Sequence, residues 1–236
     1  MNYYSSSIVV DAHDVDFNGI ASAGTLMRYI QSSAEMQLAD NNMSYDRLKE
    51  KKRAFILSKI KLEFTESAVC GERLNAETFP CDSRGFTFIR CYRLIKNERI
   101  ICRAVSAWAL IDTDSRSLIR VNDFDLGLTT YSPLDLPLER IVMPKELAEI
   151  GKYTVRYADL DRNRHMNNTR YPDMYSNFLP IEGKRISAIT ISYLNEARIG
   201  EELSVYMAEE NGVYYIRTLR SDGKVNSEAE IHLCTI

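Results

Sequence analysis

The chain has 236 residues, of which 45% are hydrophobic and 27% charged, and its formal net charge is −3. These values are typical of globular proteins, and the length allows one large or two small domains with adequate cores. The negative charge argues against a dedicated nucleic-acid binder, and no apolar run approaches the roughly 18 residues that a membrane span needs. The five cysteines form no C-x-x-C pair, so we expect a reduced, cytoplasmic protein.

Hydrophobic periodicity predicts two helices, each followed by four strands. The first helix is expected over 22–39, with strands near 54–66, 72–81, 86–96 and 99–112. The second is expected over 168–179, with strands near 185–195, 201–209, 212–220 and 224–235. Hairpin signals at Asn211-Gly212 and Asp222-Gly223 imply antiparallel pairing. The intervening segment has three prolines and little periodicity, so we expect domains at 1–112 and 151–236 joined by a linker, 113–150.

The two predicted domains repeat one another. Residues 14–20 (DVDFNGI) align with residues 159–165 (DLDRNRH) at an offset of 145, which is 159 − 14. Residues 58–64 align with residues 187–193 at an offset of 129, which is 187 − 58. Both matches occur in the same order, so the sequence indicates an internal duplication with a shorter helix-to-strand connection in the second copy.

The second copy carries a group of residues suited to catalysis. Asp161, Asn163 and His165 recur at every second position before the predicted helix. Alternate residues of an extended segment project to one side, so we expect these side chains to face one small volume. A carboxylate, an amide and an imidazole that titrates near neutrality are together suited to activating a water.

Comparison of the two copies distinguishes residues that serve catalysis from residues that the fold requires. His165 aligns with Ile20, and Glu196 aligns with Ser67. A residue that the fold requires should persist in both copies, so these two are predicted to serve catalysis. The counterparts of Asp161 and Asn163 do persist, which indicates that both also help to turn the chain or cap a helix. The second half is therefore predicted to be active and the first half silent.

The order Asp-x-Asn-x-His-x-Asn-Asn-x-x-Tyr, read from Asp161 to Tyr171, resembles the signature of acyl-acyl carrier protein (acyl-ACP) thioesterases. The resemblance extends to residues 192–197, where Glu196 is retained and Ala197 stands where relatives have a cysteine. It implies an α+β tandem (double) hotdog, in which each half is an antiparallel sheet wrapped around a central helix. The start of the chain lacks the transit peptide of the plant proteins, so we expect the bacterial, cytoplasmic type.

The family implies hydrolysis of fatty acyl-ACP to a free fatty acid by carboxylate-activated water. One histidine with nearby carboxylates lacks the spacing of a known set of metal ligands, so neither a metal nor a cofactor is expected. Its catalytic residues map onto Asp161, Asn163, His165 and Glu196. We assign the base to the Asp161–Glu196 pair, with Glu196 preferred. His165 would orient the water or protonate the leaving sulfur, and Asn163 would fix its partners by hydrogen bonds.

Five further residues are candidates for substrate binding: Asn167, Asn168, Tyr171, Arg162 and Arg164. The two asparagines are better suited to capping the helix, and Tyr171 lies on a stripe that favours core packing. The two arginines alternate with the catalytic residues, so we expect them to point the other way, toward an acidic acyl carrier protein.

Two other functions remain open on the sequence. A hotdog thioesterase acting on acyl-CoA is the nearest alternative, and a non-catalytic acyl-binding module is the second. Because a double hotdog supplies within one chain the pairing that single hotdogs obtain by dimerising, either a monomer or a homodimer is expected.

Overall fold

The computed structural model describes residues 3–236. The first half contains β1 (Tyr4–Val9), η1 (Ala12–Asp14), α1 (Ala23–Asp40), α2 (Tyr45–Glu50), β2 (Arg53–Phe64), β3 (Arg73–Arg84), β4 (Thr87–Lys96) and β5 (Arg99–Asp112). The connection contains β6 (Leu118–Ile119) and η2 (Val121–Asp123). The second half contains β7 (Ala148–Thr154), η3 (Tyr157–Asp159), α3 (Arg170–Ser176), β8 (Lys184–Tyr193), β9 (Glu202–Glu210), β10 (Val213–Leu219) and β11 (Val225–Thr235). No helix among the described residues is long and apolar enough to cross a bilayer.

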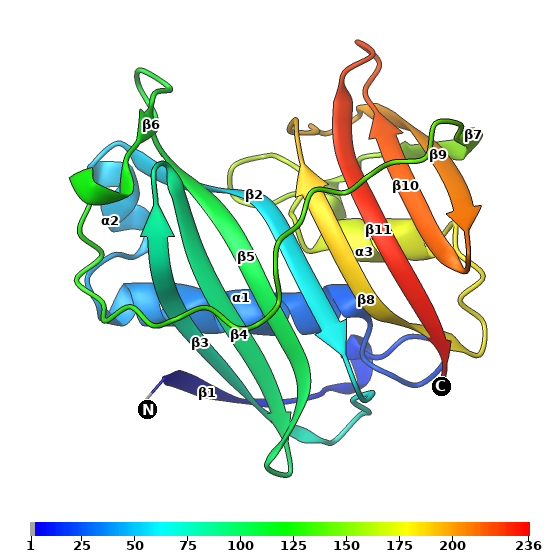
Figure 1. Ribbon diagram of the computed structural model, residues 1–236, viewed down its shortest axis with the longest axis horizontal. Helices are drawn as coiled ribbons and strands as arrows, with labels where there is room; N and C mark the ends of the chain where they lie inside the picture. The colour runs from blue at the N-terminus through cyan, green and yellow to red at the C-terminus, as the bar shows by residue number, and fades with distance from the viewer. Residues whose placement is uncertain (1–2) are drawn as a thin grey trace.

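The strands form one continuous antiparallel sheet in the order β1-β3-β4-β5-β2-β8-β11-β10-β9-β7, with β6 added beside β5. The strands of the first half curve over α1 and those of the second half over α3 (Figure 1). The two halves join where β2 pairs with β8. This arrangement confirms the predicted α+β class.

The pairing of β2 with β8 confirms the duplication. Ile60 lies opposite Ile191, and Leu62 lies opposite Ile189. The counterpart of Ile60 in the second copy is Ile189 (60 + 129 = 189), and that of Leu62 is Ile191 (62 + 129 = 191). Each of these β2 residues therefore pairs with the counterpart of the other. A pseudo-twofold axis therefore passes near the central pair, Lys61 and Thr190.

The two helices approach each other closely beside this axis. The side chain of Ser22 caps α1 by accepting a hydrogen bond from the Thr25 backbone N–H at 3.1 Å. A Cβ at Gly24 would lie 2.3 Å from Asp173 Oδ1, so any other residue here would require the Asp173 carboxylate to move. Asp173 in turn accepts hydrogen bonds from Ser22 at 2.8 Å and Arg28 at 3.2 Å. These polar contacts fix α1 against α3.

The structure departs from the predicted elements at the edges and in the second helix. The second helix was predicted over 168–179, but α3 covers only Arg170–Ser176. The edge strands β1 and β7 and the short helix α2 were not predicted. The expected domain boundary at 151 falls inside β7, which begins at Ala148. The connection between the halves crosses the outer face of the first sheet, where Leu136 is buried among Phe79, Cys81, Cys91 and Val105.

Candidate active site

The segment that carries the candidate residues is a closed turn. The Asp161 N–H donates to the His165 carbonyl at 2.9 Å, and the Arg164 N–H donates to the Asp161 carbonyl at 3.0 Å. Oδ1 of Asp161 accepts from the backbone N–H groups of Asn163 (2.8 Å) and His165 (3.3 Å). The expectation of an extended segment with alternating faces was therefore wrong.

The first copy, which was predicted to be silent, forms the same turn. Oδ1 of Asp16 accepts from the backbone N–H groups of Asn18 at 2.8 Å and Ile20 at 3.4 Å. Gly19 adopts a φ of +76°, and Arg164 takes the equivalent left-handed conformation with a φ of +64°. One oxygen of Asp161 thus builds the turn, as the persistence of its counterpart indicated.

The turn brings His165 and Glu196 together from different elements. His165 Nε2 lies 3.1 Å from Glu196 Oε2, and the two side chains are 24% and 54% exposed. The Met166 N–H donates to the carbonyl of buried Ala197 at 2.8 Å, which ties the motif to the turn after β8. The sequence placed both residues in the site, and the structure records Glu196 against His165 rather than against Asp161.

Asn226, which the sequence did not single out, holds the turn that carries Glu196. Its side chain is fully buried and donates from Nδ2 to the Asn195 carbonyl at 2.5 Å. Its own carbonyl accepts from the N–H groups of Leu194 at 2.9 Å and Asn195 at 3.1 Å. Asn226 Oδ1 accepts from the Thr218 hydroxyl at 2.9 Å. The position of Glu196 therefore depends on a buried amide of β11.

A cavity of about 780 Å³ lies in the first half, between the C-terminal part of α1, α2 and the inner face of the first sheet. The motif of the second half closes one side of it through Asp161, Arg162, Asn163, Asn167 and Asn168. His165 and Glu196 are outside the cavity wall, next to that side. The volume falls within the range of roughly 300–1,000 Å³ that ligand sites occupy.

Tyr45, on α2 of the silent half, joins the site to the cavity. Its hydroxyl donates to Asn163 Oδ1 at 2.7 Å, and this hydrogen bond fixes the orientation of the Asn163 side-chain amide. The Arg162 guanidinium lies 3.7 Å from the centroid of the Tyr45 ring and 3.3 Å from Glu35. Arg162 was expected to point away from the catalytic side chains, but the turn directs it into the cavity wall. Tyr45 was missed because only the fold brings it to the motif.

The other predicted binding residues divide into three cases. Asn167 Oδ1 accepts from the N–H (2.9 Å) and hydroxyl (2.8 Å) of Thr169, which is the N-cap residue of α3. Asn167 therefore forms a turn just before the helix, rather than capping it, and also borders the cavity. Tyr171 is 3% exposed and accepts from Asn226 Nδ2 at 3.0 Å, so it belongs to the core. Burial raises the pKa of Tyr171 to about 12, which keeps its hydroxyl protonated. The side chain of Arg164 is exposed and forms no hydrogen bond or ion pair with another described residue.

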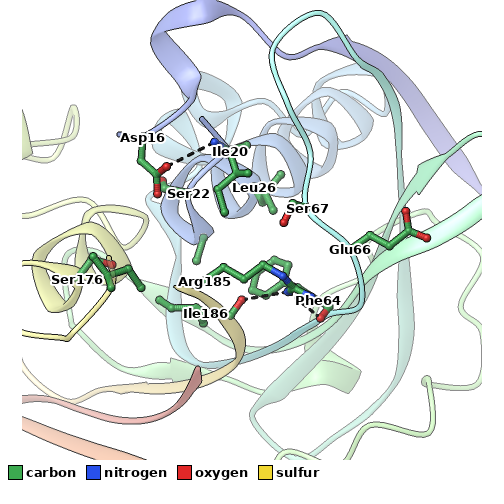
Figure 2. A pocket seen from close by; sticks show the side chains of 13 residues that line it. Asp16, Ile20, Ser22, Leu26, Phe64, Glu66, Ser67, Ser176, Arg185 and Ile186 are labelled. Atoms are coloured by element: carbon green, nitrogen blue, oxygen red, sulfur yellow. Dashed lines mark hydrogen bonds between the residues drawn. The ribbon is translucent and has the colours of Figure 1, made fainter. Parts of the chain in front are cut away.

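The equivalent position in the silent copy is closed (Figure 2). Asn18 donates to the carbonyls of Ile181 at 3.1 Å and Lys184 at 3.2 Å, which draws the connection after α3 over the motif. Arg185 extends across the remaining space and donates to the Phe64 carbonyl at 3.1 Å. The pocket left there measures only about 30 Å³, enough for about one water.

Comparisons with known proteins agree with this architecture. An oleoyl-acyl carrier protein thioesterase from Arabidopsis thaliana is 23% identical over 222 residues, covering 83% of this chain and 60% of the relative. The chain thus spans about 60% of that relative's length. Two solved structures resemble the whole chain: an acyl-ACP thioesterase from Bacteroides thetaiotaomicron (TM-score 0.85, 22% identity, 98% and 97% coverage), and a 12:0-ACP thioesterase from Umbellularia californica (TM-score 0.86, 15% identity, 99% and 97% coverage). These likenesses confirm the tandem hotdog fold.

The sequence profiles of one family cover nearly the whole chain. The acyl-ACP thioesterase N-terminal domain matches residues 1–125, and the C-terminal domain matches residues 143–233. The order of the two domains is the order of the two halves described above. The chain therefore belongs to the acyl-ACP thioesterase family.

Proposed function

We propose that this protein hydrolyses the thioester of fatty acyl-ACP and releases a free fatty acid. The observation that carries the proposal is that a cavity of about 780 Å³ in one half is bordered by the motif of the other half. An acyl chain in the cavity would place its thioester beside Asp161 and Asn163. The exposed side of His165 and Glu196 would then face the carrier arm.

The pairing of His165 with Glu196 supports a specific acid–base role. Because His165 Nε2 faces Glu196 at 3.1 Å, Nδ1 is the ring nitrogen left to act on water. His165 takes the proton as the water oxygen attacks the carbonyl carbon, and Glu196 stabilises the imidazolium that forms. When the carbon–sulfur bond breaks, the same proton passes to the leaving thiolate. In place of the Asp161–Glu196 pair, we therefore propose a His165–Glu196 unit.

Asp161 and Asn163 are proposed to position the reactants. Oδ1 of Asp161 is occupied by backbone N–H groups. Oδ2 accepts only a long hydrogen bond, 3.4 Å, from Asn163 Nδ2, so Oδ2 is the oxygen proposed to hold the water. Asn163 Oδ1 is occupied by Tyr45, so its N–H₂ group is the part that can donate. Ala197 is buried where relatives carry a cysteine, so no acyl-enzyme on sulfur is expected at that position.

The proposed carrier is acyl carrier protein, and the proposed location is the cytoplasm. Exposed Arg164 next to the catalytic turn suits an acidic partner. The odd number of cysteines, five, argues against a disulfide framework and hence for a reducing compartment.

Turnover of the purified chain tests the proposal directly. We expect hydrolysis of acyl-ACP to exceed that of the matching acyl-CoA; the reverse order would establish the acyl-CoA alternative. His165→Ala and Glu196→Ala should each lower kcat by about a hundredfold or more. His232→Ala is the matched control, because His232 forms a similar pair with Glu230 at 3.3 Å on β11. Normal hydrolysis by folded His165→Ala would refute its assigned role.

A further inference from the structure

The cavity contains a buried cation without a counter-ion. Arg90, on β4, lines the cavity and is 7% exposed. Its Nη1 donates to two neutral oxygens, Gln37 Oε1 at 2.5 Å and Thr78 Oγ1 at 3.0 Å. No carboxylate of a described residue lies within 4.0 Å of its guanidinium nitrogens. Burial lowers the pKa of Arg90 from its usual value, the effect expected where a charge is buried without a partner.

Several other arginines of the sheet are paired with carboxylates. Arg103 on β5 lies 2.8 Å from a carboxylate oxygen of Glu63, and Arg217 on β10 lies 2.5 Å from Glu228. The carboxylates that line the cavity are engaged elsewhere. Glu35 pairs with Arg162, and Asp161 accepts from backbone N–H groups. Arg90 therefore lacks the carboxylate partner that Arg103 and Arg217 have.

The fold does not require a cation at this position. Pro80 lies opposite Arg90, and its counterpart Glu209 (209 − 80 = 129) lies opposite Tyr214. Tyr214 thus occupies the position of Arg90 in the second half, where it packs in the hydrophobic core at 8% exposure. The same internal comparison was applied to His165 and Ile20. Because the second half has an uncharged residue at this position, the fold does not need the charge of Arg90, and we relate that charge to the cavity.

A second polar group points to the same conclusion. Gln31 of α1 also lines the cavity, and its Nε2 is buried without a hydrogen-bond partner among the described residues. A donor buried in this way is costly unless a ligand accepts from it. Arg90 lacks a counter-charge and Gln31 Nε2 lacks an acceptor, so a ligand that suits both must carry acceptor oxygens.

We propose that the cavity selects acyl chains that bear an oxygen acceptor beyond the thioester, and that Arg90 binds this oxygen, with a carboxylate as the best match. A carboxylate supplies both the missing counter-charge and two acceptor oxygens. A hydroxyl or keto oxygen would satisfy the hydrogen bond alone and bind more weakly. The inference rests on the proposed function, since it assumes that the cavity holds the acyl group.

Binding of non-hydrolysable probes tests the selectivity apart from catalysis. The probes are the N-methylamide of decanoic acid and the mono-N-methylamide of the ten-carbon dicarboxylic acid, measured by calorimetry on the whole chain. We expect the carboxylate-tipped amide to bind about tenfold tighter or more, the scale of one charge-assisted hydrogen bond. Equal binding, or tighter binding of the methyl-tipped amide, would overturn the proposal in the unmodified protein alone.

Three variants assign the effect to Arg90. Arg90→Met should reverse the preference, and Arg90→Lys should retain part of it. Arg103→Met removes a sheet arginine that is paired with Glu63 outside the cavity wall, so it should leave the preference unchanged. Persistence of the preference in a folded Arg90→Met would refute the assignment. If the probes behave as expected but no acyl-ACP is hydrolysed, the proposed function fails while the binding selectivity stands.

Discussion

Asn226 offers the sharpest test of how the fold positions Glu196. In Asn226→Ala, the Asn195 carbonyl and the Tyr171 hydroxyl both lose the donor that now serves them at 2.5 Å and 3.0 Å. A buried group left without its partner costs about 1–3 kcal/mol, so two such groups predict a loss of about 2–6 kcal/mol in the free energy of unfolding. For a chain of this size that corresponds to a fall in Tm of about 4–24 °C.

The effect on turnover should be separate from the effect on stability. Asn195 directly precedes Glu196, so release of its carbonyl allows the turn to move. A displacement of about 1 Å in a catalytic group costs about a hundredfold in rate. We therefore expect kcat for acyl-ACP to fall by about one to two orders of magnitude at a temperature where the variant is folded, with a smaller change in KM.

Ser227→Ala is the matched control for this variant. Ser227 is the next residue on β11 and is also fully buried. Its hydroxyl accepts from Tyr175 at 2.8 Å and lies 2.7 Å from the Thr218 hydroxyl, with no contact to the Glu196 turn. Ser227→Ala should lower Tm but leave kcat close to normal. An equal loss of kcat in both variants, or a normal kcat in Asn226→Ala, would show that the buried amide does not position Glu196.

Three further changes probe the neighbouring contacts. Tyr45→Phe removes the 2.7 Å hydrogen bond to Asn163 but keeps the ring, so kcat should fall about two- to tenfold; steady-state kinetics at wild-type rates would argue against a role for that bond. Gly24→Ala places a Cβ 2.3 Å from Asp173 Oδ1 and should cost about 1–3 kcal/mol in the free energy of unfolding, which an unchanged Tm would contradict. Arg164→Glu should raise KM for acyl-ACP, and added salt should weaken the wild-type reaction, while a small thioester is hydrolysed as before; equal effects on both substrates would place the docking surface elsewhere.

The fold was largely predictable because its signals are local. The strand pairs of each meander alternate in period two and are closed by tight turns, and β4 and β5 differ from their predicted bounds by at most one residue. The missed elements lack such signals. β1, with the sequence YSSSIV, is an edge strand whose side chains alternate between half-buried and exposed. The second helix was predicted too long because its apolar stripe continues into turns that pack against the core at Phe178 and Leu179.

The candidate site was predictable only where both copies could be compared. His165 and Glu196 stood out because Ile20 and Ser67 replace them in the silent copy, and the structure places the two within 3.1 Å. The outward direction predicted for Arg162 failed because the motif forms a turn rather than a strand. Contacts between distant segments, such as the one from α2 to Asn163, leave no periodic pattern in the sequence.

The duplication explains how one site needs both halves. Near the pseudo-twofold axis, the motif of each copy meets the helix-to-strand connection of the other: Asn163 meets Tyr45 in residues 41–52, and Asn18 meets Ile181 in residues 177–183. The longer connection contains α2 and borders the cavity. The shorter connection is held over the motif of the first copy by hydrogen bonds from the Asn18 side chain to backbone carbonyls. The second half can therefore lose its own cavity and fill its core with a buried network of Tyr171, Asn226 and their partners. Under the proposed function, the first half needs no histidine or glutamate of its own, because the motif of the second half borders its cavity. Neither half alone would contain both a chamber for a ligand and the groups to act on it.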